Sequence, residues 1–149
     1  MNLLIVDDDT ISNFVNTRVA QKSGLFSEIR SVNSGMAALS VFIEVCNGTA
    51  EAPDIVLLDL HMPGMNGFDF IEALKGFAYP HKERLTIVIL TSSDHKGDMD
   101  RANAMGIKHY LMKSLSLQEL QATIFSLYNK AQDVFRDNAS NDINPSLTF

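Results

Sequence analysis

The sequence has 149 residues, of which 46% are hydrophobic and 20% are charged, and its formal net charge is −6. This length suits one domain that buries a core without disulfides, and the single cysteine, Cys46, excludes an internal disulfide. The acidic net charge argues against a strongly basic surface that would bind nucleic acid. The sequence shows no basic leader of a signal peptide and no apolar run of the ~18 residues that membrane insertion needs. We therefore expect a cytoplasmic protein.

Short apolar runs alternate along the chain with amphipathic segments of helical period. The runs that predict strands are residues 3–6, 28–32, 54–59, 85–91 and 108–113. The segments that predict helices extend from about 10 to 22, from 34 past 43, across 68–74, from about 97 to 105 and from 116 to about 135. In the first of these helices, the apolar residues at helical spacing are Ile11, Phe14, Val15 and Val19.

Strands that alternate with helices in this way predict an α/β fold, in which a parallel sheet carries helices on both faces. The predicted domain covers residues 2–135. The polar segment 136–149 has the composition of a mobile tail, and we expect no output domain.

Chemically informative side chains follow the apolar runs directly. Asp7, Asp8 and Asp9 follow the first run, Asp59 ends the third, Thr91 ends the fourth and Lys113 ends the fifth. The carboxyl ends of parallel strands meet at one edge of a sheet, which is where open α/β folds bind ligands. Converging carboxylates need a counter-charge, which Lys113 or a divalent cation can supply, and all-oxygen ligands favour Mg²⁺.

A carboxylate beside Mg²⁺ and a lysine can act as a nucleophile toward phosphorus, and Asp59 is the best candidate. Phosphoryl transfer needs its equatorial oxygens neutralised, and Mg²⁺, Lys113 and the Thr91 hydroxyl can each take one. The sequence therefore predicts a site that accepts a phosphoryl group.

In their order along the chain, four motifs together resemble the response-regulator receiver domain, the CheY-like module of two-component signalling. They are the strand 3–6 followed by Asp7-Asp8, the segment 57–67 (LLDLHMPGMNG), Leu90-Thr91-Ser92-Ser93 and Tyr110-Leu111-Met112-Lys113. The resemblance covers residues 2–135. It implies a flavodoxin-like (βα)5 fold, doubly wound, with a five-stranded parallel sheet in the order 2-1-3-4-5.

The resemblance also implies roles at the acidic edge. Asp59 matches the phosphoacceptor, and Asp7 and Asp8 match the acidic pair that organises Mg²⁺. His61 matches the position that lends its backbone carbonyl to the metal, so the implied metal site consists of Asp7, Asp8, Asp59 and that carbonyl.

Three further positions match the receiver pattern. Lys113 matches the lysine that contacts the phosphoryl group, Thr91 the switch hydroxyl and Tyr110 the aromatic residue that rotates with it. In that family a histidine kinase or a histidine phosphotransfer protein donates the phosphate. The face around the fourth helix, fifth strand and fifth helix then binds a protein target, in a monomer or weak dimer.

Two positions depart from the family pattern. Ser114 replaces the proline that usually follows the lysine, where the bond is commonly cis. Because a cis bond before a residue other than proline costs ~3–4 kcal/mol, we expect a trans bond or stored strain. His61 stands where small polar residues are common, and its side chain is expected to border the phosphate and to alter its lifetime.

Two other functions fit parts of the sequence. A Mg²⁺-dependent phosphatase or phosphotransferase of small metabolites would place its nucleophile on the first strand and carry a cap, whereas the best nucleophile here ends the third. A pseudo-receiver that never accepts phosphate fits Ser114 but not the complete acidic site. We therefore expect a stand-alone response regulator that signals by conformational switching rather than an enzyme.

Overall fold

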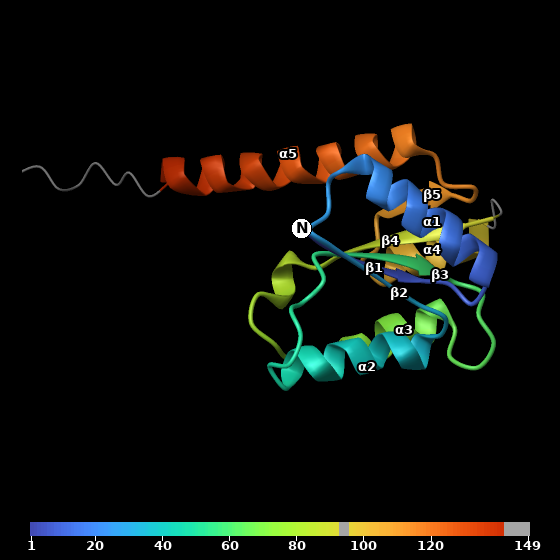
Figure 1. Cartoon of the computed structure of the whole chain (residues 1–149). Helices are drawn as coiled ribbons and strands as arrows, with labels where there is room; N and C mark the ends of the chain where they lie inside the picture. The colour runs from blue at the N-terminus through green and yellow to red at the C-terminus, as the bar shows by residue number, and fades with distance from the viewer. Residues whose placement is uncertain (93–95, 142–149) are drawn as a thin grey trace, which may run out of the picture.

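The computed structural model describes residues 1–92 and 96–141 of the chain. A parallel five-stranded sheet has the order β2-β1-β3-β4-β5, which confirms the predicted doubly wound α/β fold (Figure 1). The strands are β1 (Asn2–Val6), β2 (Glu28–Val32), β3 (Ile55–Asp59), β4 (Thr86–Thr91) and β5 (His109–Met112).

The helices are α1 (Thr10–Ser23), α2 (Gly35–Cys46), α3 (Gly67–Leu74), α4 (Lys96–Ala104) and α5 (Leu117–Asn141), and a short 3-10 helix, η1, spans Lys82–Arg84. Helices α1 and α5 lie on one face of the sheet, and α2 and α3 lie on the other (Figure 1). This two-layer cover explains the continuous apolar runs in the sequence, because a strand covered on both faces has no side turned to water.

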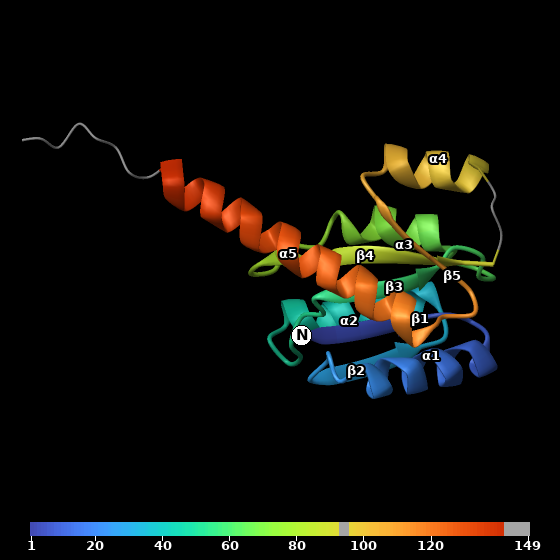
Figure 2. The ribbon, with the colours of Figure 1, turned by 90° about the horizontal axis from the view of Figure 1, so that it is seen from above.

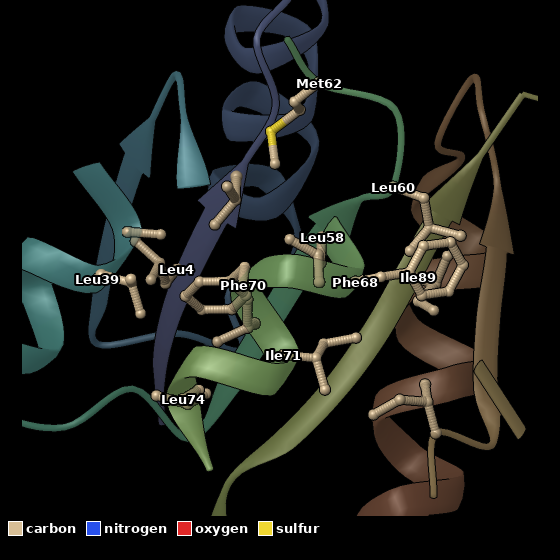
Figure 3. Close-up of a cluster of buried hydrophobic side chains, with 14 of the residues drawn as sticks. Leu4, Leu39, Leu58, Leu60, Met62, Phe68, Phe70, Ile71, Leu74 and Ile89 are labelled. Atoms are coloured by element: carbon tan, nitrogen blue, oxygen red, sulfur yellow. The ribbon is translucent and has the colours of Figure 1, made fainter. Parts of the chain in front are cut away.

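Alternate residues of each strand enter two separate hydrophobic clusters. In β1, Leu4 and Val6 face the cluster under α2 and α3, whereas Leu3 and Ile5 face the one under α1 and α5. Figure 3 shows the first cluster, in which Phe70 of α3 lies among side chains of the sheet. These buried layers hold the strand ends in a rigid frame.

The first helix contradicts the simplest interpretation of its apolar pattern. The side chains of Ile11 and Phe14 are 76% and 62% exposed, while Asn13 and Asn16 are buried. The side-chain amide of Asn13 donates to the backbone carbonyls of Asp7 (2.6 Å) and Val32 (3.1 Å). The helix turns the Asn13 amide inward, where it donates to backbone carbonyls at the ends of β1 and β2.

Helix α5 is longer than predicted, since it continues past residue 135 to Asn141. Its far end projects beyond the sheet (Figures 1 and 2). A helix that is already nucleated against a core gains one hydrogen bond for each residue added to it. The polar residues after 135 therefore continue α5 to Asn141. The rest of the predicted tail, residues 142–149, and Ser93 lie outside the described residues.

Candidate functional site

The strand ends bring the predicted acidic residues to one edge of the sheet. Asp59 is the last residue of β3, and Asp7 follows β1 directly. The backbone N–H of Asp7 donates to the carbonyl of Val32 (3.2 Å), and that of Lys113 donates to the carbonyl of Thr91 (2.8 Å). These two backbone hydrogen bonds continue the sheet beyond the ends of β1 and β5 and thus fix the backbone positions of Asp7 and Lys113.

Three carboxylates converge at this edge. One oxygen each from Asp7, Asp8 and Asp59 lies within 4.8 Å of the others. Asp7 and Asp59 are buried, at 0% and 5% exposure, whereas Asp8 is exposed. The cluster therefore combines two desolvated charges with one that faces solvent.

Lys113 joins the two buried carboxylates. Its Nζ lies 2.8 Å from Asp7 Oδ2 and 3.2 Å from Asp59 Oδ2. The remaining oxygens accept backbone hydrogen bonds: Asp7 Oδ1 from the N–H of Asp9 (2.9 Å), and Asp59 Oδ1 from the N–H of His61 (3.1 Å). Both carboxylates are thus held in fixed orientations.

Burial and neighbouring charges shift the pKa values of Asp59 and Lys113. Burial raises the pKa of Asp59, and the nearby charge of Asp7 adds to this, against the His61 amide and Lys113, which act to lower it. For Lys113 burial acts to lower the pKa, but the hydrogen bond to Asp7 and the charges of Asp59 and Asp7 outweigh it, so its pKa is raised. The lysine is therefore protonated at neutral pH and supplies only part of the counter-charge.

The donor set fits a small hard cation. Three carboxylates against one ammonium leave negative charge uncompensated, and carboxylate oxygens are the ligands that Mg²⁺ prefers. One carboxylate is exposed, which leaves room for the waters that Mg²⁺ usually keeps.

Three other predicted residues lie around this cluster. Thr91 is buried at 9% exposure at the end of β4. The hydroxyl of Tyr110 is turned toward α4, where it donates to Asn103 Oδ1 at 2.6 Å. The Nε2 atom of His61 lies 2.8 Å from Asp98 Oδ2, so the His61 side chain contacts α4.

The bond between Lys113 and Ser114 is cis, so the trans alternative for this bond is wrong.

Two contributors to the site carried no clear signal in the sequence. A Cβ atom at Gly67 would lie 2.7 Å from the backbone oxygen of Asp59 and 2.8 Å from Leu60 Cα, so only glycine lets α3 begin so close to the phosphoacceptor candidate. Asp98 is 37 residues from His61 in sequence, and their contact depends on where α4 lies. The segment Asn66-Gly67 indicated a turn, but its spacing could not show this close approach.

The chain belongs to the response regulator receiver domain family, whose sequence pattern matches residues 3–125. This confirms the resemblance seen in the sequence. The family is a signalling domain of two-component systems, and several curated relatives join it to further sequence, since the chain spans between 25% and 50% of their length.

Individual relatives agree with this assignment. Protein PilH of Pseudomonas aeruginosa is 30% identical over 82% of this chain and 93% of its own length. A two-component response regulator from Cytophaga hutchinsonii has a similar structure, with a TM-score of 0.74, 32% identity and coverage of 89% of this chain and 96% of that one. The receiver domain of the histidine kinase CKI1 from Arabidopsis thaliana, solved with Mg²⁺ and BeF₃⁻, has a TM-score of 0.73 and 25% identity, and the match covers 86% of this chain and 89% of that one. None of the helices in residues 1–92 and 96–141 is long and apolar enough to cross a membrane.

Proposed function

We propose that the protein accepts a phosphoryl group on Asp59 from the phosphohistidine of a histidine kinase or phosphotransfer protein. The observation that carries this proposal is the position of Lys113 Nζ, 2.8 Å from Asp7 Oδ2 and 3.2 Å from Asp59 Oδ2. A positive charge shared between an acidic metal-ligand candidate and a nucleophile candidate is what a phosphoryl acceptor needs.

In the proposed reaction an Asp59 carboxylate oxygen forms a bond to phosphorus while the bond from phosphorus to the donor nitrogen breaks, and that nitrogen keeps the electron pair. Asp7, Asp8, Asp59 and the backbone carbonyl of His61 would hold Mg²⁺, which when bound neutralises phosphoryl oxygen charge. Lys113 neutralises a second oxygen. The backbone N–H of His61, already on Asp59 Oδ1, keeps the carboxylate oriented.

Signalling would follow from a change of conformation. The Thr91 hydroxyl would turn toward the phosphoryl group and Tyr110 would leave its bond to Asn103, which lies in α4. We propose that the altered surface of α4, β5 and α5 binds a protein target, in a monomer or weak dimer, and that the domain turns over no metabolite. That it acts as a stand-alone cytoplasmic regulator stays a prediction.

Acetyl phosphate and Mg²⁺ test the acceptor role without the unknown kinase. Intact-mass spectrometry of the wild type should show the gain of one phosphoryl group. When the reaction is quenched and the sample is then treated with base, this group should be lost, because base hydrolyses an acyl phosphate. The variant Asp59→Asn should gain none, and Asp133→Asn, which changes an exposed aspartate of α5, should match the wild type.

Other outcomes would favour the other functions. No adduct in the wild type, with Mg²⁺ and without it, would indicate a pseudo-receiver. Rapid release of phosphate from many phosphate monoesters without an adduct would indicate a phosphatase. An adduct that persists in Asp59→Asn would show that another residue is the acceptor.

A further inference from the structure

Helix α4 has little apolar packing. Among the described residues of this helix, Ala102 alone is buried, and Met99 is 36% exposed. In Figure 2 the helix lies at the edge of the molecule, next to α3. Burial of one small side chain contributes little free energy, so contacts other than core packing must hold this helix in place.

Two of these contacts come from α3 and β5. The guanidinium group of Arg101 lies over the ring of Phe68 in α3, 4.1 Å from its centroid. The hydroxyl of Tyr110 in β5 donates to Asn103 Oδ1 at 2.6 Å and contacts the carbonyl oxygen of Met99 at 3.3 Å. Both contacts are polar or cation–π contacts at the rim of the fold, and contacts of each kind contribute modestly to stability.

The third contact comes from the loop that follows the phosphoacceptor candidate. His61 Nε2 lies 2.8 Å from Asp98 Oδ2, and the Asp98 side chain is only 26% exposed. The backbone N–H of the same His61 donates to Asp59 Oδ1 at 3.1 Å. One residue thus bonds Asp59 through its backbone and α4 through its ring.

We propose that Asp98 is a positioning residue whose bond to His61 couples the position of α4 to the phosphoryl state of Asp59. This inference rests on the proposed function, because it needs Asp59 to be the acceptor. A phosphoryl group on Asp59 places new oxygens beside the His61 loop, where they compete with Asp98 for the imidazole. Phosphorylation therefore loosens the bond from His61 to Asp98 and frees α4 at its first turn.

Coupling of this kind is reciprocal. If phosphorylation weakens the bond between His61 and Asp98, then removal of that bond must favour the phosphorylated state. A partly exposed pair changes an equilibrium by a small factor, so Asp98→Ala should bind a phosphoryl mimic about twofold to fivefold more tightly than the wild type.

Fluoroberyllate with Mg²⁺ is a suitable probe, because its binding reports the acceptor site without a kinase. Amide hydrogen exchange of residues 97–104 reports α4 in the same samples. The variants are Asp98→Ala, His61→Ala and the double variant, and Asp100→Ala is the matched control, since it removes an exposed carboxylate from the same helix. The double-mutant cycle separates the pair from any general effect of altered helix charge.

We expect Asp98→Ala to show faster exchange in α4 without fluoroberyllate, and to bind fluoroberyllate more tightly. In the His61→Ala background the same change should alter neither quantity, and Asp100→Ala should behave as the wild type. Equal effects in both backgrounds, unchanged α4 exchange, or weaker fluoroberyllate binding would each overturn the coupling. Failure of the wild type to bind fluoroberyllate would overturn the proposed function as well, whereas normal binding without an Asp98 effect would overturn the coupling alone.

Discussion

Asp59 combines burial with incomplete charge compensation, and this sets how its ionisation affects stability. Its pKa is raised mainly by burial, so the folded protein holds this proton more tightly than the unfolded chain does. For a group with that shift, stability is greatest below the unfolded pKa of ~3.9 and falls as pH rises through the folded pKa. The acidic site is therefore formed at a cost in stability.

Asp59→Asn should relieve that cost. Without Mg²⁺ at pH 7, we expect the variant to be more stable than the wild type by on the order of 1 kcal/mol, with the difference vanishing as the pH falls below ~4. Added Mg²⁺ should raise the melting temperature of the wild type more than that of the variant. Thermal melts across pH test this, and parallel curves for the two proteins would contradict it.

Tyr79 is partly buried, and its hydroxyl oxygen is shielded from solvent. Burial raises its pKa to about 12, and within the described ranges its hydroxyl oxygen has no hydrogen-bond partner. Its ring packs against Phe42, with centroids 5.8 Å apart. Since the ring contributes packing and the hydroxyl only a desolvation cost, phenylalanine should serve better at this position.

Tyr79→Phe should raise the free energy of unfolding by about 0.5–1 kcal/mol at pH 7. The wild type should also lose stability above pH ~10, where the unfolded tyrosine ionises first, and the variant should lose less. Urea titrations at pH 7 and pH 10.5 measure both effects, with Tyr128→Phe, at an exposed position, as the control. A destabilised Tyr79→Phe would mean that the hydroxyl has a partner.

At the scale of the element, the first turns of α1 bury polar side chains, whereas Ala20 further along the helix enters the hydrophobic cluster. Asp9 caps this helix, accepting from the N–H groups of Ile11 (2.8 Å) and Ser12 (3.0 Å). Its buried face carries Asn13 and Asn16, while Phe14 lies outside. The hydrogen bonds of the Asn13 amide make the specific contacts at this end of the helix.

This arrangement predicts opposite outcomes for two neighbouring substitutions. Asn13→Ala should destabilise the protein by about 1–3 kcal/mol, because it removes one buried and one partly buried hydrogen bond. Phe14→Ala should cost about 0.5 kcal/mol, since an exposed ring loses only its contact with the Arg18 guanidinium, 5.4 Å from the ring centroid. Chemical denaturation compares the two, and a larger loss for Phe14→Ala would contradict the observed orientation of α1.

At the scale of the whole molecule, one of the two hydrophobic clusters supports α5, and only over part of the helix's length. Leu120 and Ile124 are buried against the sheet at 0% and 2% exposure, whereas the end of the helix projects past the sheet (Figure 1). The stability of the domain should therefore depend on the first turns of α5 and not on its last ones.

Deletion of residues 136–149 should leave the free energy of unfolding within about 0.5 kcal/mol of the wild type and leave phosphorylation by acetyl phosphate unchanged. Leu120→Ala, in the packed part of the same helix, should cost about 2–5 kcal/mol. Thermal and urea unfolding measure both. A loss above ~1 kcal/mol on deletion would show that the end of α5 packs against something in solution.

The sequence by itself determined the order of strands and helices and the residues of the acidic edge. Continuous apolar runs such as 55–58 identify strands covered on both faces, and parallel strands must bring their carboxyl ends to one edge. Asp7 follows such a run, Asp59 ends one, and Lys113 follows the shorter strand β5, so local pattern was enough to predict that they would meet.

Only the tertiary structure decided which side α1 turns inward, the isomer of the Lys113–Ser114 bond and the contact between His61 and Asp98. The orientation of α1 and the contact of His61 depend on groups that are distant in sequence, namely the carbonyl of Val32, 19 residues from Asn13, and Asp98, 37 residues from His61. Periodicity records which residues are apolar, but it cannot record which buried polar groups need a partner. That need is set when the elements pack, and here it orients α1 and ties α4 to the acidic edge.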